Sequence, residues 1–326
     1  MRAAWYERQG GAHDVLNVGE LETPRPGAGD VRIRIAASGI NPGDVKKRQD
    51  AFGVGMSFPR VIPHSDGAGV VDAVGEGVTA EWIGRRVWCF GAQTYRPFGT
   101  AAEYTVVPVA QVVPLPGGVS FEAGACLGIP GITAHRAVHV AGPVTGKAVL
   151  VHGGAGSVGS FAVHLARLAG AGHIIATCRT DQQREIALRA GAHHALLSGA
   201  DDLAGRIKAL APEGIEHVIE VAFDANIALD VEVLAQGGSI ATYATGAPTP
   251  SLPVWLLVFA NARLFFVGSD DVPTEAKQEA AGDINRALEA GWPGPNIAAA
   301  FPLEYIAQAH EAVEYPTKPG RLVLTL

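Results

Sequence analysis

A glycine-rich turn between an apolar segment and a helical one constrains the fold of this chain more than any other feature. The segment 148–152 reads AVLVH, which is typical of a buried strand, and the helix predicted after the turn runs to about residue 170. Between them, the pattern G-x-G-x-x-G permits a tight turn, a close approach of a pyrophosphate, and close packing of helix on strand. The helix N-terminus adds unpaired N–H groups and a positive dipole end. The motif therefore predicts a dinucleotide site at Gly154, Ala155, Gly156, Ser157, Val158 and Gly159.

Strands and helices alternate on the C-terminal side of this turn. We expect further strands at 174–178, 217–222, 239–244 and 264–268, and helices at 181–190, 226–235 and 254–260. Such alternation is typical of a parallel sheet with helices on both faces. The fold class predicted for this part of the chain is α/β, with a doubly wound parallel sheet.

The first third of the chain has a different pattern and predicts a β-rich domain. Segments 31–35, 67–75, 86–90 and 102–107 are apolar or alternate between apolar and polar residues, and Gly- and Pro-rich turns separate them. Near the end of the chain we expect two helices, at 275–290 and 303–313, and a strand at 321–326. That last strand does not fit the alternation that precedes it.

Composition and charge exclude several classes of protein. Hydrophobic residues make up 48% of the 326 residues, which excludes an intrinsically disordered chain. The net charge is −7 and the densest basic group is the short run 46–48, so we expect no nucleic-acid partner. Three dispersed cysteines predict no disulfide framework. Because no apolar stretch approaches the ~20 residues of a membrane span, we expect no membrane association and a cytoplasmic location.

The end of the second strand of the alternating region predicts which dinucleotide binds. NAD enzymes carry an Asp or Glu there, which binds the ribose hydroxyls. Here Cys178 takes that position, Arg179 and Thr180 follow, and Arg184 lies one helical turn beyond. Cationic and hydroxyl groups suit a 2′-phosphate, which a carboxylate would repel. We therefore predict NADP(H) as the cofactor, bound in part by Arg179, Thr180 and Arg184.

The same glycine turn has a competing interpretation. Residues 155–159 (AGSVG) are similar to the nucleophile elbow G-x-S-x-G of hydrolases, with Ser157 as the nucleophile. A hydrolase would also need an acid and a histidine later in the chain, which Asp224 or Asp230 and His310 would supply. The complete glycine pattern and the cationic strand end argue against this interpretation.

Over its whole length the sequence resembles the zeta-crystallin-type quinone oxidoreductases of the medium-chain dehydrogenase/reductase superfamily. The resemblance rests on ordered motifs: GINPGD at 39–44, PHSDGAGVV at 63–71, GRRV at 84–87, GTAAEY at 99–104 and IPGITAHRA at 129–137. It implies a GroES-like β-rich catalytic domain formed by residues 1–121 and 264–326, and a Rossmann NADP-binding domain at 122–263. This arrangement explains the last strand, and it implies an active-site cleft where the domains meet.

The resemblance implies an enzyme that works without a metal ion. Zinc-dependent alcohol dehydrogenases of the superfamily hold their catalytic zinc with Cys, His and Cys, and Asn41, Ser65 and Ile129 occupy those positions here. These side chains are not a zinc donor set, and the four clustered cysteines of the structural zinc lobe are missing as well. We therefore predict no metal.

The activity implied by the resemblance is the reduction of a small-molecule acceptor by NADPH. Quinones accept hydride or electrons without the help of a Lewis acid, so a zinc-independent quinone reductase is the leading hypothesis. The alternative is an NADPH-dependent double-bond reductase of α,β-unsaturated ketones or aldehydes. A non-catalytic NADPH-binding protein and a hydrolase that uses Ser157 are more remote hypotheses.

The resemblance also implies individual site residues. Asn41 is expected beside the nicotinamide and the acceptor, and Asp44 is expected to order the same loop. Lys46 stands where many relatives have Tyr, and Tyr95 in the loop 91–99 completes the predicted catalytic residues. Besides Asn41, the remaining predicted cofactor contacts are Thr133, Ser198, Tyr243, Ala244, Thr245, Gly246, Val267, Gly268 and Ser269.

The segment 264–268 predicts a subunit contact. It reads LFFVG and would form an edge strand of the cofactor-binding sheet. An apolar edge strand without charges promotes aggregation unless something covers it. We expect a homodimer through this edge, as the resemblance also implies. In a monomer, the segment 255–259 would have to cover it.

Overall fold

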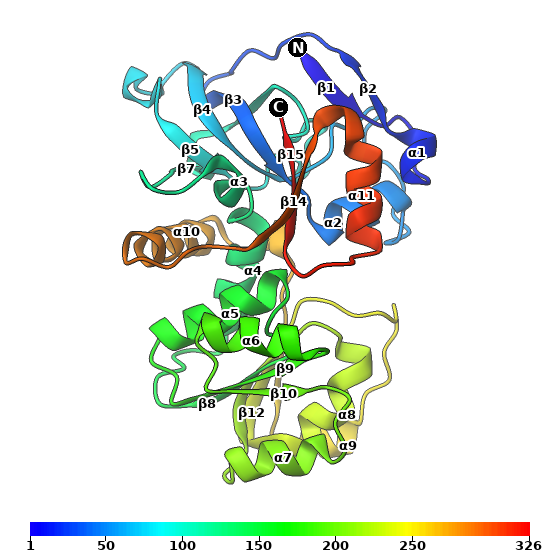
Figure 1. The fold of residues 1–326 in the computed structure, drawn as a ribbon, viewed down its shortest axis with the longest axis vertical. Coiled ribbons are helices and arrows are strands. Elements are labelled where there is room, and N and C mark those ends of the chain that lie inside the picture. Colours follow the sequence, from blue (N-terminus) through cyan, green and yellow to red (C-terminus); the bar gives the residue numbers. More distant parts are fainter. The chain divides into compact units, whose positions relative to one another are not determined.

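The structure is a computed structural model that describes all 326 residues (Figure 1). The chain divides into two compact units, one formed by Met1–Pro130 and Pro273–Leu326 and the other by Gly131–Val272. The first unit combines N-terminal and C-terminal segments, as the resemblance implies, but both boundaries lie about ten residues later than the expected 121/122 and 263/264. The reason is packing: Phe121–Gly124 lies against strands of the first unit, and Arg263–Phe266 pairs with a strand of the second.

The first unit is built around a largely antiparallel sheet in the order β14-β15-β3-β4-β5-β7, with β6 also paired to β3 and a separate pair β1-β2. Its strands are β1 Arg2–Trp5, β2 Asn17–Glu20, β3 Asp30–Gly39, β4 Asp66–Val74, β5 Arg86–Cys89, β6 Tyr104–Pro108, β7 Val112–Pro114, β14 Ile297–Pro302 and β15 Arg321–Thr325. Its helices are α1 Ala12–Val15, α2 Pro42–Gln49, α3 Phe121–Gly124, α10 Thr274–Glu289 and α11 Ile306–Glu314. Helix α4, Gly128–His139, crosses the boundary between the units.

The last strand of the chain belongs to the N-terminal sheet. Strand β15 runs antiparallel to β3, with Val323 opposite Gly39 and Thr325 opposite Ala37. Alternating apolar residues of β3, among them Val31 and Ile33, point into the core of this unit and are fully buried. The sheet therefore accounts for the strand that did not fit the βα alternation.

The second unit is a doubly wound α/β fold. Its six strands are all parallel, in the order β10-β9-β8-β11-β12-β13. They are β8 Ala148–Val151, β9 His173–Cys178, β10 His194–Leu197, β11 Ile215–Glu220, β12 Leu234–Thr242 and β13 Arg263–Phe266. Helices α5 Ser157–Leu168 and α6 Asp181–Ala190 cover one face, and α7 Leu203–Leu210, α8 Phe223–Val233 and α9 Val254–Phe259 cover the other (Figure 1).

This strand order confirms the predicted fold class and locates its ligand edge. In sheets of this order successive strands are added to one side up to the third and to the other side from the fourth, and ligands bind at the carboxyl ends of the strands at this switch between the first and fourth strands. Here the switch lies between β8 and β11. Central residues such as Leu150, Ile175 and Val218 are fully buried between the helical layers. The sequence did not predict β10 or α7. Strand β10 is short and carries a histidine where apolar residues would mark a strand. No helix combines the length and the apolar composition needed to cross a membrane.

Close contact between β3 and β4 makes one glycine essential to the first unit. A Cβ atom added to Gly69 would lie 2.0 Å from the carbonyl oxygen of Arg34. We expect Gly69→Ala to destabilise the protein by about 1–3 kcal/mol, because the two strands would have to separate. Urea denaturation would measure this. In Gly117→Ala the new methyl group meets nothing within 4 Å, so its stability should match that of the wild type. Equal stability of the two variants would contradict the prediction.

Candidate active site

The glycine turn lies at the carboxyl end of β8 and has the close contacts that its motif predicts. Gly153 has φ +63°, in the left-handed region that favours glycine. A Cβ on Gly159 would lie 2.1 Å from the Gly153 carbonyl oxygen, and a Cβ on Gly154 would lie 2.6 Å from the Ala176 side chain. Gly156 is the N-cap of α5 and has no side chain to accept hydrogen bonds. The first N–H groups of α5 therefore have no capping acceptor, as in sites that bind phosphate.

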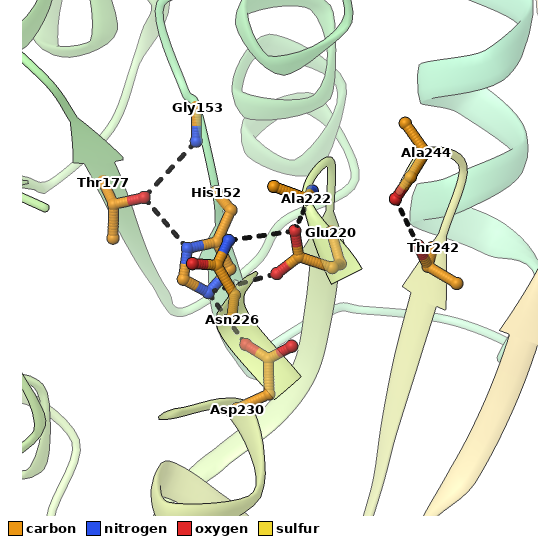
Figure 2. Close-up of polar contacts among 9 residues, drawn as sticks. All are labelled: His152, Gly153, Thr177, Glu220, Ala222, Asn226, Asp230, Thr242 and Ala244. Carbon is orange, nitrogen blue, oxygen red and sulfur yellow. Dashed lines mark hydrogen bonds and ion pairs between the residues drawn. The ribbon is translucent and has the colours of Figure 1, made fainter. Parts of the chain in front are cut away.

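A buried polar network holds the base of this turn (Figure 2). Thr177 Oγ1 on β9 accepts a hydrogen bond from Gly153 N at 3.3 Å and lies 3.0 Å from Nδ1 of His152. On its other side, Nε2 of His152 lies 2.8 Å from Oδ1 of Asp230, on α8. The imidazole of His152 thus connects the end of β8, the neighbouring strand β9 and helix α8.

Glu220, at the end of β11, completes the network. Its Oε1 accepts hydrogen bonds from Ala222 N and from Asn226 Nδ2, while Oε2 lies 3.6 Å from His152 Nε2 (Figure 2). Glu220 and Asp230 are fully buried, and one oxygen of each carboxyl group has no hydrogen-bond partner. Two carboxyl groups therefore face one histidine away from water, which is costly unless protons compensate the charge.

Protons supply that compensation. Burial raises the pKa of Glu220 to about 7, although the nearby His152 acts in the opposite direction. Burial also acts to lower the pKa of His152, but its hydrogen bond with Asp230 and the two carboxylates prevail and raise it. A shared cation fits less well, because two ligands of one tetrahedral zinc lie about 3.3 Å apart. The 2.8 Å between His152 and Asp230 is instead a hydrogen-bond distance.

The predicted phosphate-binding residues divide into two groups. Arg179, at the end of β9, has an exposed guanidinium that makes no hydrogen bond or ion pair with the chain. Thr180 follows Arg179 in the chain and caps α6. The backbone N–H of Ser198 donates to the carbonyl oxygen of Cys178, so Ser198 lies near Arg179 across the sheet. The guanidinium of Arg184 is occupied, because it donates to Ala195 O and to Asp181, both at 2.9 Å.

The predicted contacts at the ends of β12 and β13 lie together. A pocket of about 400 Å³ is lined by Tyr243, Ala244, Thr245, Val267 and Gly268, among others. Val267 N donates to Thr242 O, and the Ala244 carbonyl accepts from Phe223 N and from the Thr242 hydroxyl (Figure 2). Gly246 N donates to Asp224, at the start of α8. Ser269 begins the short turn after β13, and Thr133 is buried on α4. The structure thus gathers most of these residues at the ligand edge of the sheet.

The predicted catalytic residues belong to the first unit and differ in how firmly they are held. Asn41 precedes α2, and its backbone N–H donates to Asp44 Oδ2 at 2.7 Å, so both residues are fixed at the helix start. Lys46 is half-buried on α2, with its ammonium 6.0 Å from the centre of the Phe52 ring. Tyr95 is 71% exposed and has φ +52°, so the loop 91–99 carries it on the surface of this unit.

Asn41 is also at the centre of a second buried network. Its Nδ2 donates to Asp66 Oδ2 at 2.8 Å, and its Oδ1 accepts from Arg321 Nη2 at 2.7 Å. Asp66 also accepts from the backbone N–H of Ile129. Burial raises the pKa of Asp66 to about 7, although these hydrogen bonds and the charge of Arg321 oppose the rise.

The residues at the three aligned zinc positions do not fit a zinc ion. Both polar atoms of the Asn41 amide are engaged by Asp66 and Arg321, Ile129 has an alkyl side chain, and Ser65 provides only a hydroxyl. Structural and catalytic zinc sites are built from cysteine, histidine and carboxylate ligands. A hydrogen-bonded carboxylate, amide and guanidinium occupy this place instead.

The structure does not assemble the hydrolase triad. Both ring nitrogens of His310 have other partners, since Nε2 lies 2.9 Å from His64 Nε2 and Nδ1 accepts from Arg48. Asp230 is paired with His152, and Asp224 accepts from Gly246 N. Ser157 is the first residue of α5 and makes no hydrogen bond to a histidine or an acid. The competing interpretation of the turn therefore fails on the geometry of its proposed partners.

Sequence reasoning missed the polar residues that support the site. Glu220 was assigned only to a strand, and Asp66 and Arg321 only to a motif and to the last strand. A signal was present in two cases, because a carboxylate within an otherwise apolar strand end predicts a buried partner. No local signal connects Arg321 with Asn41, which lies 280 positions earlier.

Comparison with known proteins identifies the relatives of both units. Residues 27–117 match the family model of the alcohol dehydrogenase GroES-like domain, and residues 157–281 match that of zinc-binding dehydrogenases. The quinone oxidoreductase of Lama guanicoe is 32% identical, with 100% of this chain and 98% of the relative covered. That of Mus musculus is 30% identical with the same coverage. A mycobacterial protein solved in complex with NADPH has a TM-score of 0.87 at 26% identity, with both chains fully covered.

The buried Glu220 predicts how stability depends on pH. The pKa of Glu220 is 4.5 without burial and about 7 in the folded protein. Its contribution to stability is therefore complete below pH 4.5 and lost as the pH rises through about 7, with a slope of at most about 1.4 kcal/mol per pH unit. Denaturation of Glu220→Gln between pH 5 and 8 should show a shallower decline than that of the wild type.

Two comparisons make this measurement specific. Asp66 contributes with the same sign in both proteins and cancels in the difference between variant and wild type, which therefore measures Glu220 together with its effect on His152. Glu213→Gln removes an exposed carboxylate from the same unit and should keep the wild-type slope. An unchanged slope in Glu220→Gln would mean that Glu220 is ionised throughout this pH range.

Proposed function

Because the chain belongs to the quinone oxidoreductase family of medium-chain dehydrogenases/reductases, we propose that it transfers hydride from NADPH to small quinones without a metal ion. It is an oxidoreductase, and the family uses NADP(H). The zinc-independent step rests on the donor set around Asn41, in which hydrogen-bonding groups replace metal ligands.

The observation that carries the proposal is the glycine turn beside an unpaired arginine. Strands β8 and β9 are parallel neighbours, so the turn after β8 and Arg179 after β9 lie at the same edge of the sheet. The open N-terminus of α5 suits the pyrophosphate, and the guanidinium of Arg179 suits a 2′-phosphate. We also assign the hydroxyl groups of Thr180 and Ser198, which neighbour Arg179, to this phosphate. Arg184 is less suited to bind the 2′-phosphate, because its guanidinium already binds Ala195 and Asp181.

The remaining predicted contacts are assigned to the nicotinamide end of the cofactor. The pocket formed by Tyr243, Ala244, Thr245, Val267 and Gly268 has apolar walls and backbone groups that suit an uncharged ring. Gly246, Ser269 and Thr133 complete this set as proposals. The network around Glu220 supports the pocket, because Tyr243 N donates to Glu220 O and Phe223 N donates to Ala244 O.

Bound NADPH supplies a hydride, and the chain's own groups must position the acceptor and stabilise the charge that develops on it. A quinone that takes up one hydride and one proton becomes a hydroquinone, with the negative charge first located on an oxygen. Hydrogen-bond donors near that oxygen lower the barrier. The amide of Asn41 is the donor we assign to this role, with Asp44 fixing its backbone. Lys46 and Tyr95 are further candidates on the same unit.

The cofactor preference is tested by replacing the unpaired arginine. We expect Arg179→Ala to weaken NADPH binding roughly 10- to 100-fold and to leave NADH binding nearly unchanged, because one charge-assisted contact to the 2′-phosphate is lost. Titration of nicotinamide fluorescence measures both affinities. Arg189→Ala, which removes another exposed arginine near the end of α6, serves as the control and should bind like the wild type.

The outcomes of this titration separate the hypotheses. If the wild type bound neither nucleotide, the proposed function would fail. If it bound NADPH and NADH equally, the assignment of Arg179 would fail while the reductase proposal survived. An acceptor screen with benzoquinones and enones then separates a quinone reductase from a double-bond reductase.

We further propose that the protein is a homodimer through the edge of the second unit's sheet. Strand β13 is an edge strand, and Phe266 on it is 72% exposed. Helix α9 adds Trp255 and Phe259, which are 72% and 70% exposed. Helix α9 packs on the sheet through Leu257 and leaves these aromatic side chains outside, so it does not cover the edge as a monomer would require. A second copy would remove this surface from water.

A charged substitution tests the dimer. We expect the wild type to have the mass of a dimer in light scattering after size-exclusion chromatography, and Phe266→Asp to have the mass of a monomer, because a buried carboxylate would oppose association. Tyr315→Asp changes an exposed aromatic residue of the first unit and should leave the mass unchanged. A monomeric wild type would refute the dimer.

A further inference from the structure

The side-chain amide of Asn41 is held from both ends by groups of opposite charge. The ionised carboxylate of Asp66, which faces the N–H groups of Asn41 and Ile129, only accepts hydrogen bonds, and the guanidinium of Arg321 only donates them. The 2.8 Å contact to Asp66 and the 2.7 Å contact to Arg321 therefore determine which end of the amide is nitrogen and which is oxygen. An amide with its ends exchanged would place a donor against Arg321 and an acceptor against Asp66.

The three side chains are also fixed in place. Asn41, Asp66 and Arg321 are at most 4% exposed, so water does not compete for these contacts. Asp66 accepts two further contacts from Ile129 N, at 2.9 and 3.0 Å. A Cβ on the neighbouring Gly128 would lie 2.2 Å from Asp66 Oδ1, so the backbone approaches the carboxylate as closely as a glycine permits. The carboxylate cannot move away from Asn41 without losing these bonds.

One hydrogen of the amide is left over. Asn41 Nδ2 carries two hydrogens, and the chain engages one of them, at Asp66. Arg321 binds the amide oxygen and so draws electron density from the nitrogen, which strengthens the remaining N–H as a donor. The arrangement presents a single, oriented donor on a residue that precedes α2.

We propose that Asp66 and Arg321 are positioning residues that orient Asn41 so that its second Nδ2 hydrogen binds the acceptor oxygen as that oxygen becomes negative. This inference rests on the proposed quinone reduction. The carboxylate and the guanidinium do not touch the acceptor, and they act by excluding the wrong orientation of the amide. By orienting Asn41 they stabilise the charged transition state and not the bound substrate, so they raise kcat and leave substrate binding nearly unchanged.

The test is a double-mutant cycle on quinone reduction by NADPH. Asp66→Asn replaces a pure acceptor with a group that also donates, and Arg321→Met removes the donor at the amide oxygen. We expect each to lower kcat roughly 10- to 100-fold, with KM for the quinone and Kd for NADPH changed less than about 3-fold. In an Asn41→Ala background, the same substitutions should lower kcat by less than about 2-fold, because the group that they orient is absent.

Conservative and control variants separate orientation from folding. Arg321→Lys keeps a donor for Asn41 Oδ1 and should retain most of the activity, whereas Arg321→Met should not. Asp72→Asn removes a carboxylate of the same strand, which pairs with Arg32, and should leave kcat unchanged. If Asp66→Asn fails to fold, the comparison of Arg321→Met with Arg321→Lys still decides the question.

Distinct results overturn the inference and the function on which it rests. Additive losses in the Asn41→Ala background, or equal activity of Arg321→Met and wild type, would overturn the positioning role while quinone reduction stood. A wild type that binds NADPH and reduces no quinone would overturn the proposed function, and the inference with it.

Discussion

The antiparallel pairing of β15 with β3 is the contact on which the site of the first unit depends. It places Arg321, at the start of β15, beside the loop that follows β3, and so brings a guanidinium within 2.7 Å of Asn41. Without this pairing the amide of Asn41 would have one charged partner instead of two, and the buried Asp66 would lose its nearby cation. The chain thus uses a backbone ladder to deliver a side-chain contact between residues 280 positions apart.

The two units compensate the charge of their buried carboxyl groups in different ways. Each buries carboxyl groups, which is unfavourable unless the charge is compensated. Around Asp66 the compensation comes from two donors, the Asn41 amide and the Ile129 backbone N–H, and from the nearby charge of Arg321, although burial still raises the pKa of Asp66 to about 7. Around Glu220 and Asp230 it comes from a histidine and from protons, and one oxygen of each carboxyl group remains without a partner. The first arrangement suits a group that must keep one orientation, and the second supports the glycine turn.

Much of the fold was predictable, because its signals are local. The glycine turn and the parallel alternation are confirmed. The place of the last strand in the first sheet is also confirmed, but it was implied by the family resemblance and has no local signal. The misses have physical reasons. Strand β10 lies at the sheet edge and has only one buried residue, so it lacks the apolar run of a central strand. The compact unit ends at Val272 and not at residue 263, because β13 is held by its parallel pairing with β12, which periodicity does not reveal.

The site was predictable only in part. The position of Arg179 at the end of β9 could be read from the sequence, whereas the hydrogen bond of Arg184 to Ala195 depends on a backbone carbonyl of the next strand. The roles of Asp66 and Arg321 depend on tertiary contacts alone.

The insertion of the second unit between two segments of the first has a consequence for biosynthesis. Residues 131–272 are continuous and contain all six strands of their sheet, so this unit can fold on the ribosome as soon as it has emerged. The sheet of the first unit is complete only with residues 321–325, because β6 pairs with the first half of β3 and residues 37–39 of β3 wait for β15. During that interval these backbone groups of β3 stay unpaired in the nascent chain, so the first unit completes its sheet later than the second.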